Sequence, residues 1–419
     1  MQRVIARIKK RDGSVVDFVQ DKITNAVFKA METHGIRDQS RAKTVSDIVT
    51  FMLEDRFGGY TIPSVEQIQD IVEMVLMKQG YHEVAKSYIL YRERHKEIRE
   101  ARETGLNLVR LIKDYINDID WKIRENSNEG VMSFSGLNAR VSGEVLSNFA
   151  LNQLYSEKIK KAHLEGDFHL HDLSYPIVAY CAGWSLEKLL RRGFGHVPNQ
   201  VHSSPAKHLE TATLHMVNYI GTMQGEFAGA QAFSSVDTLL APFVRADKLD
   251  YERVKQDIQK LIFGLNVPSR WGWQTPFSNL TFDWTVPEDM KDKPVVIGGE
   301  ELKSTYGEYQ REMDMINRSF LELMRDGDQQ GRVFTFPIPT YNLTKNFDWD
   351  TPNAILLFDV TAKYGIPYFQ NYLGTNLDPG DLRAMCCRLN LDQRELLRRP
   401  GNIWGPGDST GSIGAVSYT

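Results

Sequence analysis

The feature that most constrains this chain is its small supply of thiols. Cysteine occurs three times in 419 residues, at Cys181, Cys386 and Cys387. The last two are adjacent, and neighbouring Cα atoms lie about 3.8 Å apart, whereas disulfides prefer roughly 5.5–6 Å. A disulfide framework is therefore not expected, and a buried apolar core has to hold the fold. Adjacent thiols favour sulfur chemistry, although a cysteine outside a disulfide is also often a small buried hydrophobe.

Composition places the chain among ordinary globular proteins. Its residues are 42% hydrophobic and 25% charged, and its length predicts two or three domains with ample core. The formal net charge of −4 gives no general attraction to nucleic acid or anionic lipid. We therefore expect small ligands, with neither nucleic acid nor a membrane as a partner.

Nothing in the sequence indicates export. Residues 1–11 are basic but contain no continuous apolar core of signal-peptide length, and no later stretch reaches the roughly 20 apolar residues of a membrane-spanning helix. The odd number of cysteines also argues for a reducing compartment. The predicted location is the cytoplasm.

The first hundred residues predict a compact, mainly helical unit that opens with a β-hairpin. Strands are expected at 4–8 and 15–18, around a tight turn at Asp12 and Gly13. Helices are expected to follow this hairpin.

Two of these helices carry clear boundary signals. The first begins at a capping box formed by Ser64 and Gln67 and ends at Gly80. The next begins near His82 and is expected to end in the charge-dense run 94–103, where we place a linker between domains.

Beyond this run, predicted helices and strands alternate, which favours an α/β architecture. The expected elements are a helix from about Thr305 to Asp326, a strand at 333–338, a helix begun by Thr351 and Pro352 and stopped by Gly365, and a strand at 366–369. Apolar residues at 413–418 indicate a buried strand. Because the sequence stops at Thr419 without a turn or a cap, we expect a truncated chain.

Five segments together resemble the anaerobic, class III ribonucleoside-triphosphate reductases, in the same order along the chain. They are Gln224–Ser235 (QGEFAGAQAFSS), Asn266–Trp271 (NVPSRW), Phe336–Asn342 (FPIPTYN), Met385–Leu389 (MCCRL) and Thr410–Gly414 (TGSIG). The basic hairpin turn and the helix that follows it resemble an ATP-cone regulatory domain. The resemblance covers nearly the whole chain.

The resemblance implies an α/β fold in two parts. Residues 1–97 would form a small, mainly helical ATP-cone with its β-hairpin, and residues 98–419 the N-terminal and central part of a ten-stranded α/β barrel, incomplete at the C-terminus. The implied activity is oxygen-sensitive radical reduction of ribonucleoside triphosphates to deoxyribonucleoside triphosphates under allosteric nucleotide control.

The resemblance also assigns site residues. Cys387 would carry a transient thiyl radical that abstracts the ribose 3′-hydrogen, and Cys181 would donate hydrogen towards the departing water. Cys386 would be an accessory thiol, with a purely structural role as the alternative. The expected substrate-binding residues are Asn126, Ser133, His171, Thr340 and Asn342.

The effector site is expected at the basic turn of the hairpin. Basic side chains beside a helix N-terminus can hold a polyphosphate, although lysines at a turn are more often simply solvated. The expected residues for ATP or dATP are Lys9, Lys10, Arg11, Asp12, Gly13 and Lys22. Further deoxynucleotide effectors would bind a specificity site near the interface of a homodimer.

The chain departs from the family in ways that bear on its cofactors. The sequence contains no Cys-x-x-Cys pair and no glycyl-radical tail, so we assign no metal ligand and no radical storage to these residues. An S-adenosylmethionine-dependent iron–sulfur activase is the implied partner. Because residues 411–419 differ from the pattern whose asparagine helps to bind formate, the reductant is either formate or a thioredoxin-like or glutaredoxin-like protein.

Histidines offer a further possibility. His169 and His171 share one face of a predicted strand and could bind a metal, but hydrogen bonding near Cys181 is the favoured interpretation. His208 and His215 are expected to lie on one helix and to pack in the core or at an interface.

Two other functions compete with the reductase. A non-catalytic nucleotide sensor that kept the cone and the barrel is the main alternative, and the retained Cys181 and Cys387 oppose it. Another glycyl-radical enzyme is disfavoured because such enzymes need no ATP-cone.

Overall fold

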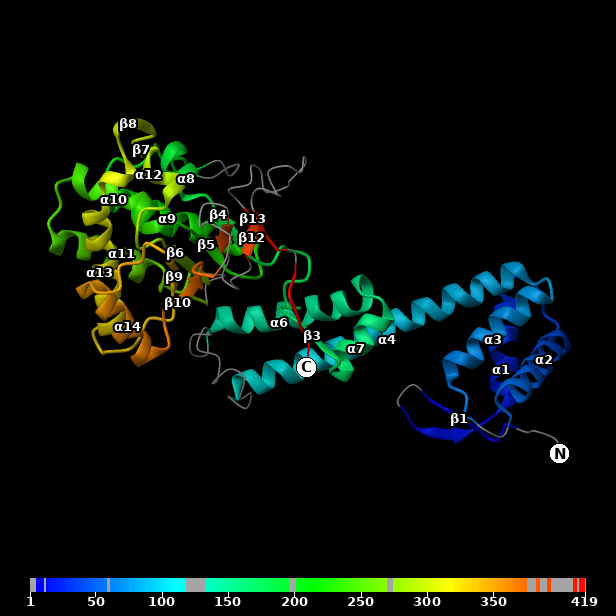
Figure 1. The fold of residues 1–419 in the computed structure, drawn as a ribbon. Helices are drawn as coiled ribbons and strands as arrows, with labels where there is room; N and C mark the ends of the chain where they lie inside the picture. Colours follow the sequence, from blue (N-terminus) through cyan, green and yellow to red (C-terminus); the bar gives the residue numbers. More distant parts are fainter. Residues whose placement is uncertain are drawn as a thin grey trace. The chain divides into compact units, whose positions relative to one another are not determined.

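The computed structural model describes residues 5–10, 13–58, 61–117, 133–195, 201–269, 274–374, 382–384, 390–392, 410–412 and 414–418. The chain divides into two compact units, Met1–Asn107 (the N-terminal unit) and Leu108–Thr419 (the C-terminal unit). Figure 1 traces both along the chain.

The N-terminal unit opens with the predicted hairpin. Strands β1 and β2 pair antiparallel, with Arg7 opposite Asp17, and Gly13 adopts the positive φ of +82° that the turn requires. The hairpin and the helices after it have the bounds β1 Arg7–Lys9, β2 Val15–Asp17, α1 Gln20–Glu32, α2 Gln39–Phe57, α3 Val65–Lys78 and α4 His82–Ile116.

Local boundary signals are confirmed in α3. The Ser64 hydroxyl accepts a hydrogen bond from the Gln67 N–H at 3.2 Å, and the Gln67 side chain accepts one from the Ser64 N–H at 2.9 Å. Helix α4 begins as predicted but does not end in the run 94–103. That run contains no glycine or proline to break a helix, and α4 continues to Ile116.

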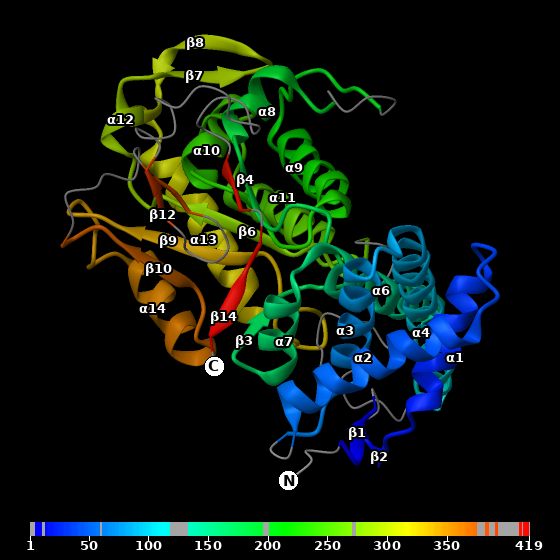
Figure 2. The same cartoon turned by 90° about the vertical axis from the view of Figure 1, so that its right-hand side faces the viewer.

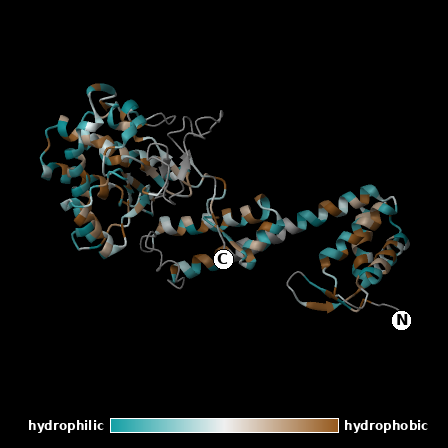
Figure 3. Cartoon of the chain, viewed as in Figure 1, coloured by the Kyte–Doolittle hydropathy of each residue, from teal (hydrophilic) through white to brown (hydrophobic). Residues whose placement is uncertain are grey.

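One apolar stripe from each helix forms the core of the N-terminal unit, and Figure 3 shows hydrophilic and hydrophobic residues alternating along these helices. The almost completely buried members include Val27, Met31, Val45, Val49, Leu53, Ile71, Val72, Val75, Leu76 and Ala85. This spacing is that of amphipathic helices packed around a common interior.

The C-terminal unit is built on a six-stranded sheet in the order β10-β9-β6-β5-β4-β13. Strands β4, β5, β6, β9 and β10 run parallel, and β13 is antiparallel to β4. The strands are β4 Ala182–Trp184, β5 Gln231–Phe233, β6 Ser278–Phe282, β9 Ile338–Leu343, β10 Tyr368–Asn371 and β13 Thr410–Gly411. The ten-stranded barrel stays a prediction.

Helices connect the parallel strands. Each parallel strand lies in the sheet beside the parallel strand that precedes it in the sequence. Connections that share one hand place the helices on one face of the sheet, and Figure 2 shows β9 and β10 side by side next to α14. The connecting helices are α8 Leu186–Arg192, α9 Leu209–Met223, α10 Val236–Ala246, α11 Tyr251–Gly264, α13 Gln310–Asp326 and α14 Pro352–Tyr364. Their apolar faces and the facing strand residues form the main core.

Smaller elements complete the described part of this unit. They are α6 Phe134–Phe149, the π-helix η1 Ala150–Leu154, α7 Glu157–Glu165, β3 Phe168–Leu170, η2 Gln224–Glu226, α12 Glu288–Lys291, β7 Pro294–Ile297, β8 Glu300–Thr305, η3 Tyr306–Glu308, β11 Leu382–Ala384, β12 Asn390–Asp392 and β14 Val416–Tyr418. Among the helices described, none combines the length and the apolar composition that crossing a bilayer requires.

Two predicted boundaries are wrong. Residues 333–337 are not a strand: Phe334 and Phe336 are buried by aromatic contacts, with ring centroids 5.1 and 5.4 Å from those of Phe263 and Phe277, and the strand β9 begins only at Ile338. The apolar pattern here reflects packing of a loop.

The helix expected from Thr305 begins instead at Gln310. Thr305 ends strand β8 and caps the short turn η3, together with Glu308. Thr305 therefore begins this short turn and not the helix.

The strand expected at 366–369 is β10, which is shifted to Tyr368–Asn371. The predictions for α14 are confirmed, and the one for the end of the chain needs a correction. Thr351 caps α14, Pro352 opens it, and Gly365 closes it with φ +69°. The apolar segment at the end of the chain does form strand β14, paired antiparallel with β3. It is not buried, since Val416 is 50% exposed.

Candidate functional site

The two faces of the main sheet differ in chemistry. Phe282 and Tyr341 point towards the helices and stack with ring centroids 5.0 Å apart. Side chains of the opposite face are polar and buried, and we call this set the polar sheet face; it consists of Asn279, Thr281, Thr340, Asn342 and Gln370. Ladder pairing sets Thr281 beside Thr340 and Asn342 beside Gln370, so these groups are immediate neighbours.

Cys181 lies on this same face. In the register of the sheet, Gly183 lies beside Ala232, and Ala232 lies beside Asn279 of the polar sheet face. Every second residue of an extended strand points to the same face, so Cys181, two residues before Gly183, also lies on this face. The thiol is completely buried against Ala230, and its Sγ accepts a hydrogen bond from the Ala230 N–H at 3.3 Å.

A glycine makes room for this thiol. A Cβ added to Gly229 would lie 2.5 Å from the Cys181 Sγ and 2.8 Å from the Tyr180 carbonyl oxygen, closer than real contacts allow. The segment 224–235 therefore brings a residue without a side chain against Cys181, which gives one of the resemblance motifs a physical role.

The segment Thr410–Gly414 also meets Cys181. The Cys181 N–H donates to the Ser412 hydroxyl at 3.2 Å, and the Ser412 N–H donates to the Cys181 carbonyl oxygen at 2.9 Å. These residues are separated by 231 positions, so two motifs far apart in the sequence converge on one thiol.

Asn342 belongs to a buried polar network. Its Nδ2 donates to Asp283 Oδ1 at 2.9 Å, while the Thr238 hydroxyl donates to Asp283 Oδ2 at 2.7 Å. Nearby, Asn279 Nδ2 donates to the Thr340 hydroxyl at 3.2 Å. The Oδ1 atom of Asn342 is buried and has no hydrogen-bond partner among the described residues.

Asp237 supports this network from α10. Its carboxylate accepts hydrogen bonds from the backbone N–H groups of Thr238, Asp283 and Trp284, and from Asn317 Nδ2, at 2.8–3.0 Å. Complete burial raises the pKa of Asp237, and the four N–H groups that donate to it act in the opposite direction.

Sequence reasoning missed Asp283 and Asp237. One signal was present for Asp283, which directly follows a completely buried strand, because the carboxyl ends of parallel strands are where α/β proteins place ligands. Asp237 carried no such signal, since its role depends on contacts with β6 and α13.

His171 lies beside a different cavity, of about 400 Å³, which is lined largely by aromatic and apolar side chains. Its Nε2 is 2.6 Å from the Ser417 hydroxyl. Ser133, another predicted substrate residue, caps helix α6: its hydroxyl accepts from the Gly136 N–H at 3.0 Å. Neither residue belongs to the polar sheet face.

Three histidine rings cluster near β3. The His169 centroid lies 5.4 Å from that of His163 and 4.9 Å from that of His171. Burial, followed by the neighbouring His171 and His163, lowers the pKa of His169. Across the residues that the structure describes, no three His, Cys, Asp or Glu side chains are arranged to hold a metal ion.

The two histidines of the predicted helix, His208 and His215, differ in burial. His215 is buried on α9, as expected, with its Nε2 2.9 Å from the Ser203 hydroxyl. His208 is exposed and pairs with Asp247 at 2.7 Å at the start of the same helix. Packing in the core is therefore wrong for His208, and packing at an interface stays a prediction.

Several predicted site residues lie outside the described part of the chain. They are Cys386, Cys387, Asn126, Arg11 and Asp12. Their assignments stay predictions.

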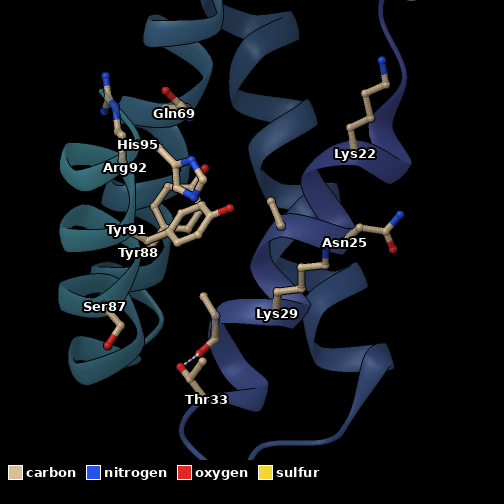
Figure 4. A pocket seen from close by; sticks show the side chains of 12 residues that line it. Lys22, Asn25, Lys29, Thr33, Gln69, Ser87, Tyr88, Tyr91, Arg92 and His95 are labelled. Atoms are coloured by element: carbon tan, nitrogen blue, oxygen red, sulfur yellow. Dashed lines mark hydrogen bonds between the residues drawn. The ribbon is translucent and has the colours of Figure 1, made fainter. Parts of the chain in front are cut away.

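The N-terminal unit contains a cavity of about 540 Å³ between α1 and α4. Figure 4 shows lysines of α1 on one side and the rings of Tyr88 and Tyr91, with Arg92 and His95, on the other. We call this the cone cavity; it is lined by Lys22, Asn25, Ala26, Lys29, Ala30, Thr33, Gln69, Ser87, Tyr88, Tyr91, Arg92 and His95. It combines cationic groups with aromatic surface.

Of the predicted effector residues, Lys22 lines this cavity. Lys9, Lys10 and Gly13 lie on or beside the hairpin and are not among its lining residues. Sequence reasoning missed Lys29, although it follows Lys22 by two helical turns on the same face of α1.

Comparison with known proteins shows which protein family the chain resembles. Residues 125–418 match the family model described as anaerobic ribonucleoside-triphosphate reductase, and residues 6–97 match the ATP cone domain. The anaerobic ribonucleoside-triphosphate reductase of Salmonella typhimurium is 28% identical over 240 residues, 57% of this chain and 33% of that protein. The enzyme of the same name from Haemophilus influenzae is 29% identical over 268 residues, 63% of this chain and 36% of that protein.

The chain thus spans about a third of the length of these curated relatives. Among solved structures, the anaerobic ribonucleotide reductase from Thermotoga maritima with citrate in the active site gives a TM-score of 0.49 at 19% identity, over 64% of this chain and 50% of that one. Because the family model covers residues 125–418, the chain belongs to the family of anaerobic ribonucleoside-triphosphate reductases and carries an ATP cone domain at residues 6–97.

Proposed function

We propose that this chain takes part in the oxygen-sensitive radical reduction of ribonucleoside triphosphates to deoxyribonucleoside triphosphates. The nucleotide would bind over the polar sheet face. The observation that carries the proposal is the placement of a completely buried thiol, Cys181, on the same sheet face as Thr340 and Asn342. A sugar needs both a hydrogen donor and hydroxyl-binding groups for this reaction, and this face offers both.

The chemistry divides between two thiols. Cys387 as a thiyl would take the 3′-hydrogen of the ribose and become a thiol, leaving a carbon radical next to the 2′-hydroxyl. Cys181 would then give that hydroxyl the proton with which it leaves as water. The reductant would supply the two electrons and the remaining proton of the net reduction, and Cys387 would return the hydrogen atom to the 3′-carbon and become a thiyl again. The apolar neighbours Ala230 and Phe277 favour the neutral, protonated thiol that this step needs. Cys386 would be a further thiol for reduction.

The family's glycyl radical supplies the oxidising equivalent when it is present. We assign neither this radical nor a zinc site to residues of this chain, because its sequence contains no Cys-x-x-Cys pair and no glycyl-radical motif. The S-adenosylmethionine-dependent activase, and formate or a thioredoxin-like or glutaredoxin-like reductant, are proposed partners. The reaction would take place in the cytoplasm, in a homodimer with a ten-stranded barrel and a specificity site for deoxynucleotides.

The cone cavity would bind ATP or dATP and set overall activity. Lys22 and Lys29 can neutralise a polyphosphate, while Tyr88 and Tyr91 present aromatic surface to a base. The hairpin residues Lys9, Lys10, Arg11, Asp12 and Gly13 would complete the phosphate site.

An anaerobic assay of the reductase with its activase, ATP and CTP tests this function. Cys387→Ala and Cys181→Ala should each abolish dCTP formation while leaving ATP affinity unchanged. Product from either variant at the wild-type rate would refute the assignment of that cysteine. A wild-type enzyme that binds ATP but forms no deoxynucleotide would support the nucleotide sensor instead.

A further inference from the structure

The amide of Asn342 is held in one orientation by a carboxylate. Asn342 and Asp283 are 4% and 3% exposed, and the Asn342 Nδ2 donates to Asp283 Oδ1 at 2.9 Å. Asp283 Oδ1 accepts this hydrogen bond, whereas an amide has one donating and one accepting end. Asp283 therefore attracts the NH₂ end of Asn342, which leaves the carbonyl Oδ1 pointing elsewhere.

The carboxylate itself has little freedom. The second carboxylate oxygen of Asp283 accepts a hydrogen bond from the Thr238 hydroxyl at 2.7 Å. The backbone N–H of Asp283 donates to Asp237 Oδ1 at 2.8 Å. Thr238 and Asp237 are both completely buried. Asp283 is thus fixed through its side chain and its backbone at once.

The backbone around this network is strained. Ser235 and Trp284 follow the neighbouring strands β5 and β6 and have φ values of +56° and +70°, a region that residues other than glycine seldom adopt. Such conformations cost energy and concentrate at functional sites. Here they flank Asp237 and Asp283, where the two strands end.

The remaining acceptor of Asn342 needs an explanation. Its Oδ1 is buried without a hydrogen-bond partner among the described residues, and a buried acceptor left unsatisfied destabilises a fold. A donor from a bound molecule would satisfy it. The hydroxyl groups of a ribose are donors of this kind.

We propose that Asp283 is a positioning residue: it orients the Asn342 amide so that Oδ1 accepts a hydrogen bond from a ribose hydroxyl of the bound nucleotide. The inference rests on the proposed function, since it requires a ribonucleotide over the polar sheet face. Asp283 would thus favour the binding of a hydroxylated sugar without contacting the sugar itself.

The test is Asp283→Asn, which keeps the size of the side chain but makes one of its two ends a donor. The Asn342 amide then loses its preferred orientation, because the introduced amide can pair with either end of it. With the cone cavity saturated by ATP, CTP affinity should fall roughly tenfold, the scale of one hydrogen bond. The preference for CTP over 2′,3′-dideoxy-CTP should shrink by a similar factor, whereas ATP affinity and thermal stability should stay near wild type.

Two further variants make the result decisive. Asp289→Asn is the matched control, because Asp289 is 39% exposed and pairs only on the surface with Lys293; it should change neither affinity nor preference. Asn342→Ala gives the full loss of the contact. If Asn342→Ala weakens CTP binding and Asp283→Asn keeps wild-type affinity and preference, the inference is overturned while the proposed function stands. If wild type does not bind CTP, or Asn342→Ala binds it as wild type does, both fail.

Discussion

Single buried residues set the geometry around the proposed site. Cys181, Asn342 and Asp237 are each almost completely buried, and each has a hydrogen-bonded polar atom that fixes its position. Interiors are packed closely enough that one added or lost group at such positions changes the free energy of unfolding measurably. Three predictions belong to this scale.

Gly229→Ala should destabilise the protein by about 1–3 kcal/mol, because the added methyl overlaps the Cys181 sulfur. Urea denaturation measures the change. Gly221→Ala is the control: Gly221 lies in α9 with nothing within 4 Å of the added Cβ, so this variant should be as stable as wild type or more so. Equal stability of both variants would show that the thiol is not tightly packed.

Asp237→Ala should cost about 3 kcal/mol or more, since four N–H donors lose their buried acceptor. Chemical denaturation followed by circular dichroism gives the value. Asp289→Ala removes only an exposed ion pair and should change stability by less than about 1 kcal/mol. A small effect at Asp237 would contradict the buried network.

Acidification should destabilise the fold through His215. Burial lowers the pKa of His215, so in the unfolded chain it binds a proton at a higher pH than in the folded state. Its contribution to stability is fully present above the unfolded pKa of about 6.5 and is lost as pH falls through the folded value. His215→Gln should therefore reduce the loss of stability between about pH 8 and about pH 5, measured by urea midpoints. An unchanged pH dependence would count against this prediction.

At the scale of elements, sequence signals succeeded where the deciding contacts are local. The hairpin, the capping box of α3 and the glycine that ends α14 depend on neighbours within a few residues, and all three are confirmed. The strand expected at 333–338 failed for the opposite reason. Phe336 packs against Phe277 across the fold, and such a partner leaves no trace in local periodicity.

Ser64→Ala should destabilise the N-terminal unit by about 1 kcal/mol, because it removes the acceptor for the Gln67 N–H at the start of α3. Thermal unfolding monitored by circular dichroism measures the shift. Thr44→Ala is the matched control, since that hydroxyl only bonds back to the Ser40 carbonyl oxygen within α2. If both variants unfold alike, the cap contributes nothing.

At the scale of the whole molecule, the residue types of the site were predictable but not their arrangement. Cys181, Thr340 and Asn342 stand out through their motifs, and the structure places all three on one sheet face. Asp283 lies 59 residues from Asn342 and meets it only through the pairing of β6 with β9. The register between two strands far apart in the sequence is set by how both pack in the finished core. It therefore cannot be predicted from local sequence patterns.

A crystal structure of the protein with CTP, grown with ATP present, tests the central claim most directly. The account predicts that the ribose lies over the polar sheet face, between Cys181 Sγ and the Cys387 thiol, with a ribose hydroxyl donating to Asn342 Oδ1. A structure in which nucleotide occupies only the cone cavity, or in which CTP binds on the helix side of the sheet away from Cys181, would contradict it.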